Sequence, residues 1–215
     1  MNTDLVKYYA LRAQEYEKIY YRPERQAEIS QLSLLLKEEF RNLKLLEIAC
    51  GTGYWTQVIS ESAKSIVATD INPEMLEIAQ GKKYPASNVR FLISDIFKMD
   101  DLEGEFEAGF GGYIWSHIPV QDLSQVLNKF QQKIQKGGKI IFIDNNHLPD
   151  YITTIVKQDK YGNGYQKRNL EDGTTHLVLK NYPEKDYLLE ILKETGKNIK
   201  YQKLKFYWTI SYETI

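Results

Sequence analysis

Short apolar runs alternate with amphipathic segments through the middle of the chain, from residue 42 to residue 145. Runs at 43–49, 65–70, 89–93, 106–114 and 139–143 predict five strands, and helical spacing of apolar residues predicts helices over 54–63, 73–82 and 122–134. Asn72 is expected to cap the second helix, ahead of Pro73, and Gly137 and Gly138 to end the third. Because alternating helices cover both faces of a sheet, this pattern predicts an α/β fold with a mostly parallel sheet.

Two regions flank this alternating core. Residues 1–40 are expected to form a helical cap, in which Pro23 separates two helices and Leu32, Leu35, Leu36 and Phe40 face the core. After the fifth strand, residues 146–182 are expected to form an insertion. Its first part, 145–165, is polar and loop-like, and 166–180 predicts a β-hairpin with its turn at 171–174. A helix over 183–194 and one or two strands within 199–212, with Phe206, Trp208 and Ile210 on one face, complete the pattern.

The composition narrows the possible classes of protein. The chain has 215 residues, of which 42% are hydrophobic, and this favours one folded domain over residues 1–215 and excludes intrinsic disorder. With 28 basic and 29 acidic residues, the near-neutral balance argues against a nucleic-acid binder that works by a bulk basic surface and leaves a local basic patch open. One Cys excludes an internal disulfide, and three scattered His residues give no reason to expect a metal site. No apolar run approaches a membrane span and the N-terminus is polar, so we expect a cytoplasmic protein with no membrane partner.

The segment from Leu46 to Trp55 carries the chemistry. It is a hydrophobic strand followed by a turn with Gly51 and Gly53, where the backbone can bend tightly and approach a ligand, and then by a helix N-terminus. Asp70 ends the next strand, 19 residues after Gly51, where a carboxylate can bind ribose hydroxyls. A dinucleotide site requires a third glycine, but Thr56 stands at that position behind two bulky side chains. The motif therefore favours a nucleoside ligand without pyrophosphate over a dinucleotide.

This order of motifs resembles the class I S-adenosylmethionine-dependent methyltransferases. The matching segments are Glu47–Gly53, Asp70, Asp95–Ile96, 111–115 and 136–142. The resemblance covers about 100 residues. It implies a doubly wound, Rossmann-like, seven-stranded and mostly parallel sheet with helices on both faces, and it implies S-adenosylmethionine as the cofactor. The residues that it implies for cofactor binding are Tyr9, Arg12, Glu47, Ala49, Gly51, Gly53, Trp55, Asp70, Ile71, Met75, Asp95, Ile96 and Gly112.

The resemblance also implies individual roles for several of these residues. Glu47 would hold the glycine turn, and Asp70 would bind the ribose diol beside Ile71. Asp95 and Ile96 would lie at the adenine edge, and Gly112 would offer its carbonyl to the amino group of the cofactor. Arg12 would pair with the cofactor carboxylate, or else it is a solvated residue of an amphipathic helix.

Methyl transfer to a hydroxyl or an amine is aided by a general base, whereas a carboxylate acceptor needs none. His117 follows the fourth strand and is the first candidate for the base, although it could also orient or cap the next helix. Tyr16 is a second catalytic candidate that could relay a proton. Tyr20, Tyr21, Trp115 and His147 are candidates for acceptor binding. The chain has 16 Tyr residues, which form either half-buried surface aromatics or a pocket lined by phenol rings.

The expected acceptor is an O or N atom of a small molecule. The segment 113–116 lacks the Asn/Asp-Pro-Pro-aromatic motif that methyltransferases acting on nucleic acids or protein amides carry there, so nucleic acid is an unlikely partner. A peptide or protein carboxyl group, RNA, and a catalytically inactive cofactor-binding subunit are the alternatives. Basic and aromatic residues of 146–182 either meet an acidic small molecule or form a solvated surface. The oligomeric state is left open.

Overall fold

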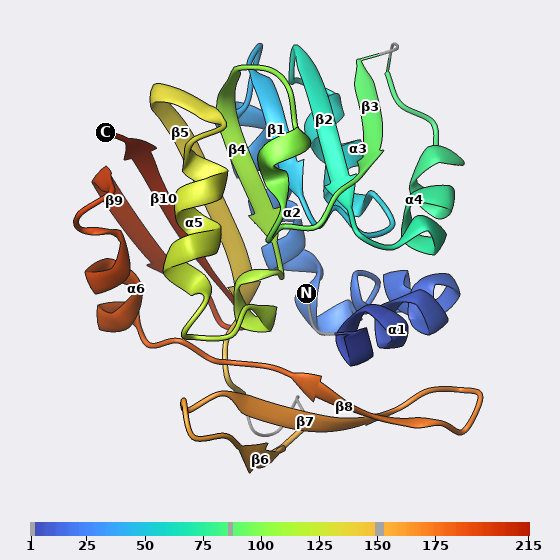
Figure 1. The fold of residues 1–215 in the computed structure, drawn as a ribbon. Coiled ribbons are helices and arrows are strands. Elements are labelled where there is room, and N and C mark those ends of the chain that lie inside the picture. The colour runs from blue at the N-terminus through green and yellow to red at the C-terminus, as the bar shows by residue number, and fades with distance from the viewer. Residues whose placement is uncertain (1–2, 86–87, 149–152) are drawn as a thin grey trace.

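A computed structural model describes residues 3–85, 88–148 and 153–215 (Figure 1). Its larger sheet has seven strands in the order β3-β2-β1-β4-β5-β10-β9. All neighbouring strands from β3 to β5 are parallel, and β10 is antiparallel to both β5 and β9. The seven strands are β1 (Lys44–Ile48), β2 (Ser65–Asp70), β3 (Val89–Ile93), β4 (Phe106–Gly112), β5 (Ile134–Asn145), β9 (Gly196–Lys203) and β10 (Tyr207–Thr214). The mostly parallel seven-stranded sheet predicted above is confirmed.

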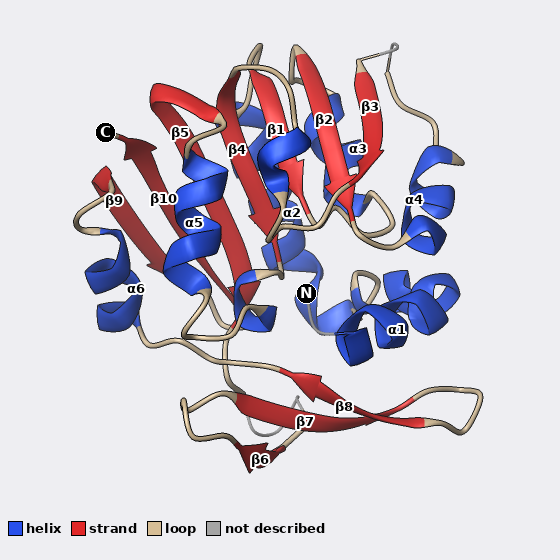
Figure 2. Cartoon of the chain, viewed as in Figure 1, coloured by secondary structure: helices blue, strands red, loops and turns tan. Residues whose placement is uncertain are grey.

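Helices cover both faces of this sheet, as Figure 2 shows. One apolar cluster joins α2 and α3 to the sheet, and a second joins α5 and α6 to the opposite face. The α-helices are α1 (Thr3–Arg12), α2 (Gln26–Glu39), α3 (Tyr54–Ser60), α4 (Pro73–Gln80), α5 (Leu123–Gln131) and α6 (Lys185–Leu192). Short 3-10 helices are η1 (Ala13–Ile19), η2 (Pro23–Arg25), η3 (Met99–Asp101) and η4 (Trp115–His117). Among the described residues, no helix has the length and apolar content needed to cross a bilayer.

A smaller antiparallel sheet lies across the carboxyl edge of the large one (Figure 1). It consists of β6 (Ile155–Gln158), β7 (Gly164–Asn169) and β8 (Thr175–Leu179). β7 and β8 pair where the sequence predicts a hairpin, with Asn169 opposite Thr175. Leu5 and Tyr8 of α1 are buried against Leu170 and Val178, so the first helix and this sheet form one covering layer over the strand ends.

Three expectations at element boundaries are wrong. The third core helix, α5, ends at Gln131, and Ile134 already pairs with Phe106 as part of β5. Gly137 and Gly138 lie inside β5, where a positive φ of 77° at Gly137 bends the strand. Strand β6 lies in the segment that was expected to be a loop. The prediction failed because the exposed, polar-rich sequence of β6 gives no strand pattern.

The side chains around β10 do not all share one face. Trp208 and Ile210 pack into the cluster with α5, as expected, but Phe206 packs into the cluster on the other side of the sheet. Phe206 precedes the first strand residue, so the two-residue alternation of a strand does not extend to it. Leu32, Leu36 and Phe40 are buried as predicted, and Leu35 is half-buried at the edge of the same cluster.

Candidate active site

The turn between β1 and α3 depends on left-handed backbone conformations. Ala49, Gly51 and Gly53 have φ values of 51°, 57° and 75°. A Cβ atom at Gly53 would lie 2.8 Å from the Tyr84 hydroxyl and 2.9 Å from the Ala79 Cβ, so no larger residue fits. At Gly51, an added Cβ would meet only the Tyr16 ring, at 3.7 Å. Because Gly51 has no side chain, its backbone is accessible from the space next to the Tyr16 ring.

Asp70 fixes this turn. Its buried carboxylate accepts the Gly51 N–H at 2.8 Å and the Asn72 N–H at 2.9 Å, and thus ties the ends of β1 and β2 together. Burial raises the pKa of Asp70, and these backbone hydrogen bonds partly offset that rise. A carboxylate has about four acceptor positions, so acceptor capacity is left for ligand hydroxyls.

Glu47 lies buried behind the turn. The Glu47 side chain is 1% exposed, and its Oε2 has no hydrogen-bond partner among the described residues. Burial raises its pKa to about 8, and the neighbouring Asp70 adds to the rise. Asp70 accepts the Gly51 N–H, and the role expected for Glu47 in holding the turn stays a prediction.

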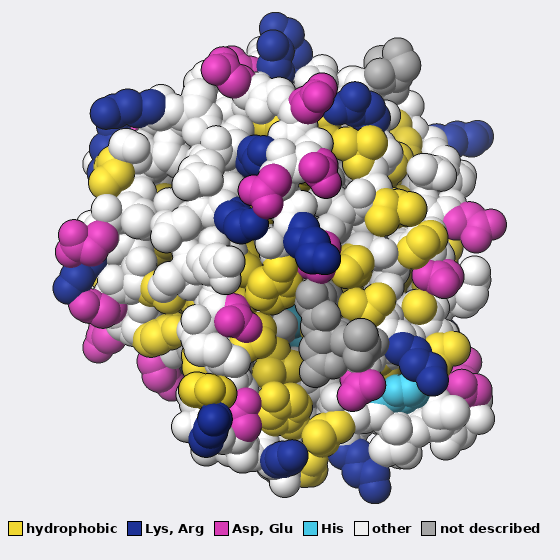
Figure 3. All heavy atoms as spheres, viewed as in Figure 1, with side chains coloured by type: hydrophobic (Ala, Val, Ile, Leu, Met, Phe, Trp, Pro, Cys, Tyr) yellow, Lys and Arg dark blue, Asp and Glu magenta, His cyan; other side chains and the backbone are white. Residues whose placement is uncertain are grey.

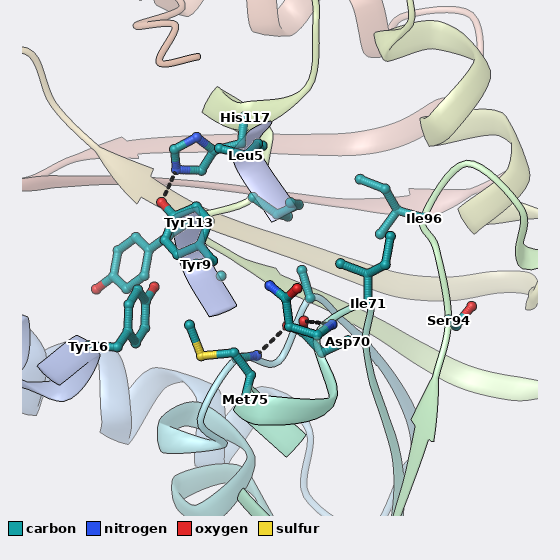
Figure 4. A pocket seen from close by; sticks show the side chains of 15 residues that line it. Leu5, Tyr9, Tyr16, Asp70, Ile71, Met75, Ser94, Ile96, Tyr113 and His117 are labelled. Atoms are coloured by element: carbon teal, nitrogen blue, oxygen red, sulfur yellow. Dashed lines mark hydrogen bonds between the residues drawn. The ribbon is translucent and has the colours of Figure 1, made fainter. Parts of the chain in front are cut away.

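A cavity opens beside the turn, between the strand ends and the N-terminal helix (Figure 4). We call it the inner cavity. Ten of the predicted site residues line it: Tyr9, Tyr16, Ala49, Gly51, Asp70, Ile71, Met75, Ile96, Gly112 and His117. Its mixture of a glycine turn, one carboxylate and apolar walls fits an adenosyl group with a polar amino-acid end. Sequence reasoning missed five lining residues, Leu5, Asn72, Ser94, Tyr113 and Ile114.

The missed residues follow a simple rule. Asn72, Ser94, Tyr113 and Ile114 come just after the predicted ends of strands or within the last few residues of the predicted fourth strand. The carboxyl ends of parallel strands meet at one edge of a sheet. The position of these residues near predicted strand ends could therefore have placed them at the site. Tyr113 also has a positive φ of 58°, a strained conformation that concentrates at functional sites. Leu5 gave no such signal, because only the docking of α1 brings it to the cavity.

Several predicted site residues lie outside the inner cavity. Trp55, Tyr20 and Trp115 are buried in the apolar clusters, at 3%, 4% and 2% exposure, because their large rings pack between helices and sheet. Tyr21 is 65% exposed and lines neither the inner cavity nor the larger cavity described below. Gly53 supports the turn from behind.

Asp95, His147 and Arg12 also lie outside the inner cavity. The Asp95 carboxylate accepts the Phe97 N–H at 3.0 Å, while its neighbours Ser94 and Ile96 face the cavity. His147 lies on another cavity, which Trp115 also lines, with its ring 4.8 Å from that of Tyr182. Arg12 lines a separate, larger cavity described below.

His117 and Tyr9 form a hydrogen-bonded pair at one end of the inner cavity (Figure 4). The His117 Nδ1 lies 2.6 Å from the Leu179 carbonyl oxygen, so Nδ1 carries the proton and donates it. The unprotonated Nε2 then accepts the Tyr9 hydroxyl at 2.7 Å. Burial lowers the pKa of His117 well below its ordinary value, and the positive charges of Lys180 and Arg168 lower it further. This environment disfavours protonation of His117, so the imidazole is a weak general base here.

A larger cavity of about 500 Å³ lies beyond this pair, and we call it the basic cavity. Tyr9, Tyr16, Tyr113 and His117 line both cavities, so they form the boundary between the two. The charged residues that line the basic cavity are Arg12, Glu15, Arg22, Arg25, Lys167, Arg168 and Lys180. Phenol rings line the boundary, which agrees with one of the two interpretations of the tyrosine content.

The N-terminal segment is fastened over the glycine turn by polar contacts. Glu17 of η1 accepts the Thr52 hydroxyl at 2.7 Å and forms an ion pair with Lys82. Ring contacts continue the attachment, since the Tyr20 ring stacks on that of Tyr54, with 3.8 Å between centroids, and lies edge-on to that of Trp55. In the described part of the chain, no group of three or more His, Cys, Asp or Glu residues is arranged to hold a metal ion.

Known proteins share this arrangement. The profile of a family described as a methyltransferase domain matches residues 45–138. Ribosomal RNA small subunit methyltransferase A of Mesomycoplasma hyopneumoniae strain 232 is 29% identical over 57% of this chain, which spans 45% of that protein. Demethylmenaquinone methyltransferase of Lactococcus lactis subsp. lactis strain IL1403 is 26% identical over 77% of this chain and 70% of its own length. The solved DhpI-SAM-HEP complex has the same fold, with a TM-score of 0.79, 22% identity and 99% of each chain covered.

The matched residues run from β1 to the bend in β5 and contain the glycine turn, Asp70 and Gly112. With the strand order, these features are similar to those of a methyltransferase domain with a Rossmann-like sheet. More particularly, the matched domain and the relatives support a class I S-adenosylmethionine-dependent methyltransferase.

Proposed function

We propose that this protein transfers a methyl group from S-adenosylmethionine to an O or N atom of a small molecule. The observation that carries the proposal is the inner cavity, in which the bare glycine turn and the Asp70 carboxylate meet apolar walls. We further propose that Asp70 binds the ribose diol, that Gly51 and Ala49 lie against the methionine part, and that Ile71, Met75 and Ile96 enclose adenine. The contacts of the described residues are compatible with each of these roles.

When bound, S-adenosylmethionine supplies a methyl group activated by a positively charged sulfur. The protein then has to hold the acceptor in line and exclude water. Tyr9, Tyr16 and Leu5 cover the inner cavity from the N-terminal segment and would do the second task. The Tyr9 hydroxyl, oriented by His117, stands at the boundary with the basic cavity and would meet the acceptor there.

RNA is the second candidate for the acceptor, because one relative is a ribosomal RNA methyltransferase. Two observations favour a small molecule. The basic cavity lies between α1 and η1 on one side and the β6–β8 sheet on the other, so an acceptor bound there would contact both. On the face shown in Figure 3, Lys and Arg side chains alternate with Asp and Glu, and no broad basic surface for a nucleic acid backbone is visible there.

The proposal is tested in two stages. Isothermal titration with S-adenosylmethionine measures cofactor binding, and release of S-adenosylhomocysteine with a metabolite library measures transfer. Binding followed by release with a small molecule supports the proposal. Release with ribosomal RNA alone would transfer the assignment to RNA, and absence of binding would refute the cofactor assignment. Binding without release from any acceptor would favour the inactive-subunit alternative.

A further inference from the structure

The basic cavity has a surplus of positive charge that the composition of the chain does not explain. Among the described residues that line it, six are basic and one, Glu15, is acidic. The whole chain has 28 basic and 29 acidic residues. The carboxylate of Glu15 is paired with a residue outside this set, because it lies 3.9 Å from the ammonium group of Lys18. The positive surplus is therefore a local property of this cavity.

Arg25 is a buried cation at the wall of the basic cavity. The side chain is 7% exposed, and its Nε has no hydrogen-bond partner in the described part of the chain. Its Nη1 donates to the Asn145 Oδ1 at 3.3 Å, and its guanidinium lies over the rings of Phe206 and Tyr207. A buried charge is costly without a counter-charge, and an anion in the cavity would provide one.

Arg12 and Arg168 are held by neutral groups in the same cavity. Arg168 donates to the Gln166 Oε1 from Nε at 3.1 Å and from Nη2 at 2.7 Å, and Arg12 lies over the rings of Tyr8 and Tyr16. No carboxylate of the described residues lies within 4.0 Å of either guanidinium. Lys180 differs, because Asp144 lies 2.8 Å from its ammonium group. Neutral groups thus hold Arg12 and Arg168 in place, and no carboxylate of the described residues neutralises their positive charges.

These charges act at the boundary where transfer would take place. Burial raises the pKa of the Tyr9 hydroxyl, and Arg168 and Arg12 counter that rise, so both guanidiniums favour negative charge at this point. His117, the nearest candidate for a base, is disfavoured as a proton acceptor by its buried and positive surroundings. A neutral hydroxyl or an ammonium acceptor would need a base, but an acceptor that is already negative would not.

We propose that the methyl acceptor is an oxyanion, namely a carboxylate, phosphate or phosphonate oxygen, bound by Arg12, Arg25 and Arg168; this rests on the proposed function. A lone pair of the acceptor oxygen forms the new O–CH₃ bond while the S–CH₃ bond breaks. The electron pair of the broken bond returns to sulfur, and no proton is released. Esterification removes one negative charge, so the arginines hold the product less tightly than the substrate.

The test uses the full chain saturated with S-adenosylhomocysteine and three probes that share a phenyl ring. These are phenylacetate, phenylphosphonate and the neutral phenylacetamide, titrated at low ionic strength. We expect at least one oxyanion to bind ten or more times more tightly than the amide, and the two oxyanions distinguish carboxylate from phosphonate recognition. The same probes are then assayed with S-adenosylmethionine, and a methyl ester is sought by mass spectrometry.

Matched variants locate the binding to the cavity. We expect Arg168→Gln and Arg12→Gln each to weaken oxyanion binding at least fivefold, Arg168→Lys to restore part of it, and both Arg168 variants to change S-adenosylmethionine affinity less than twofold. Arg41→Gln, an exposed arginine outside the cavities, is the control for general charge loss. Equal binding of amide and oxyanions, or unchanged binding in both Gln variants, would overturn the inference. If S-adenosylmethionine itself does not bind, the proposed function fails, whereas the oxyanion titration still decides whether the cavity is an anion site.

Discussion

Replacement of Asp70 by Asn tests the centre of the cofactor assignment with almost no change in size. The Asp70 carboxylate accepts two backbone N–H groups, from Gly51 and Asn72, on different oxygens. Asn has one acceptor oxygen, and its NH₂ group would face the other N–H, so one charge-assisted hydrogen bond is lost. A hydrogen bond to a charged group contributes about 1.5–3 kcal/mol. If the same oxygens also hold the ribose diol, binding loses an interaction of comparable size.

The expected result is a dissociation constant for S-adenosylmethionine raised by about tenfold to about 150-fold, since about 1.36 kcal/mol corresponds to a factor of ten. Isothermal titration measures this dissociation constant. The titration is run below the melting temperature of the variant, because Asp70→Asn also removes a hydrogen bond from the turn. Asp101→Asn removes an exposed carboxylate and serves as the matched control. If Asp70→Asn bound the cofactor within twofold of the parent protein, the assignment of Asp70 to the ribose would be wrong.

Four further results are expected. His117→Ala should lower kcat at least tenfold while cofactor affinity changes less than threefold, because the Tyr9 hydroxyl loses its partner; an unchanged kcat would remove the pair from the mechanism. With an oxyanion acceptor, kcat/KM should stay level between pH 6.5 and 9, because the pKa of His117 is lowered, and a rising limb near pH 6.5 would argue for a base. Gly53→Ala should lower the melting temperature, since its Cβ would lie 2.8 Å from the Tyr84 hydroxyl. Because the folded pKa of Glu47 is about 8, above its ordinary 4.5, the folded state retains this proton where the unfolded state has lost it. The resulting stability is complete below about pH 4.5 and lost as pH rises through about 8, so Glu47→Gln should flatten the fall in melting temperature between pH 6 and 8.

The core of the fold and the cofactor edge were predictable because they follow from local patterns. Apolar runs of strand length between amphipathic helices determine a parallel sheet, and parallel strands bring their carboxyl ends to one edge. Gly51, Asp70, Ile71 and Gly112 each stand at such an end, so their convergence on one cavity followed from chain order alone. Trp55 follows the same motif yet lies in the core, since side-chain direction is set by packing on α3 and not by chain order.

Only the tertiary structure decided how the cavity is closed and what lies beyond it. Tyr9, Arg12, Arg25, His117 and Arg168 come from four separate parts of the chain, and no sequence spacing relates them. The docking of α1 on the β6–β8 sheet brings the Tyr9 hydroxyl to His117 and the guanidiniums into one cavity. The surroundings of a side chain determine its chemistry as much as its residue type does. The ordinary pKa of histidine predicts that His117 is a base, but burial beside Lys180 and Arg168 lowers the pKa of His117. Electrostatic environment depends on distances in space, and these are properties of the folded chain alone.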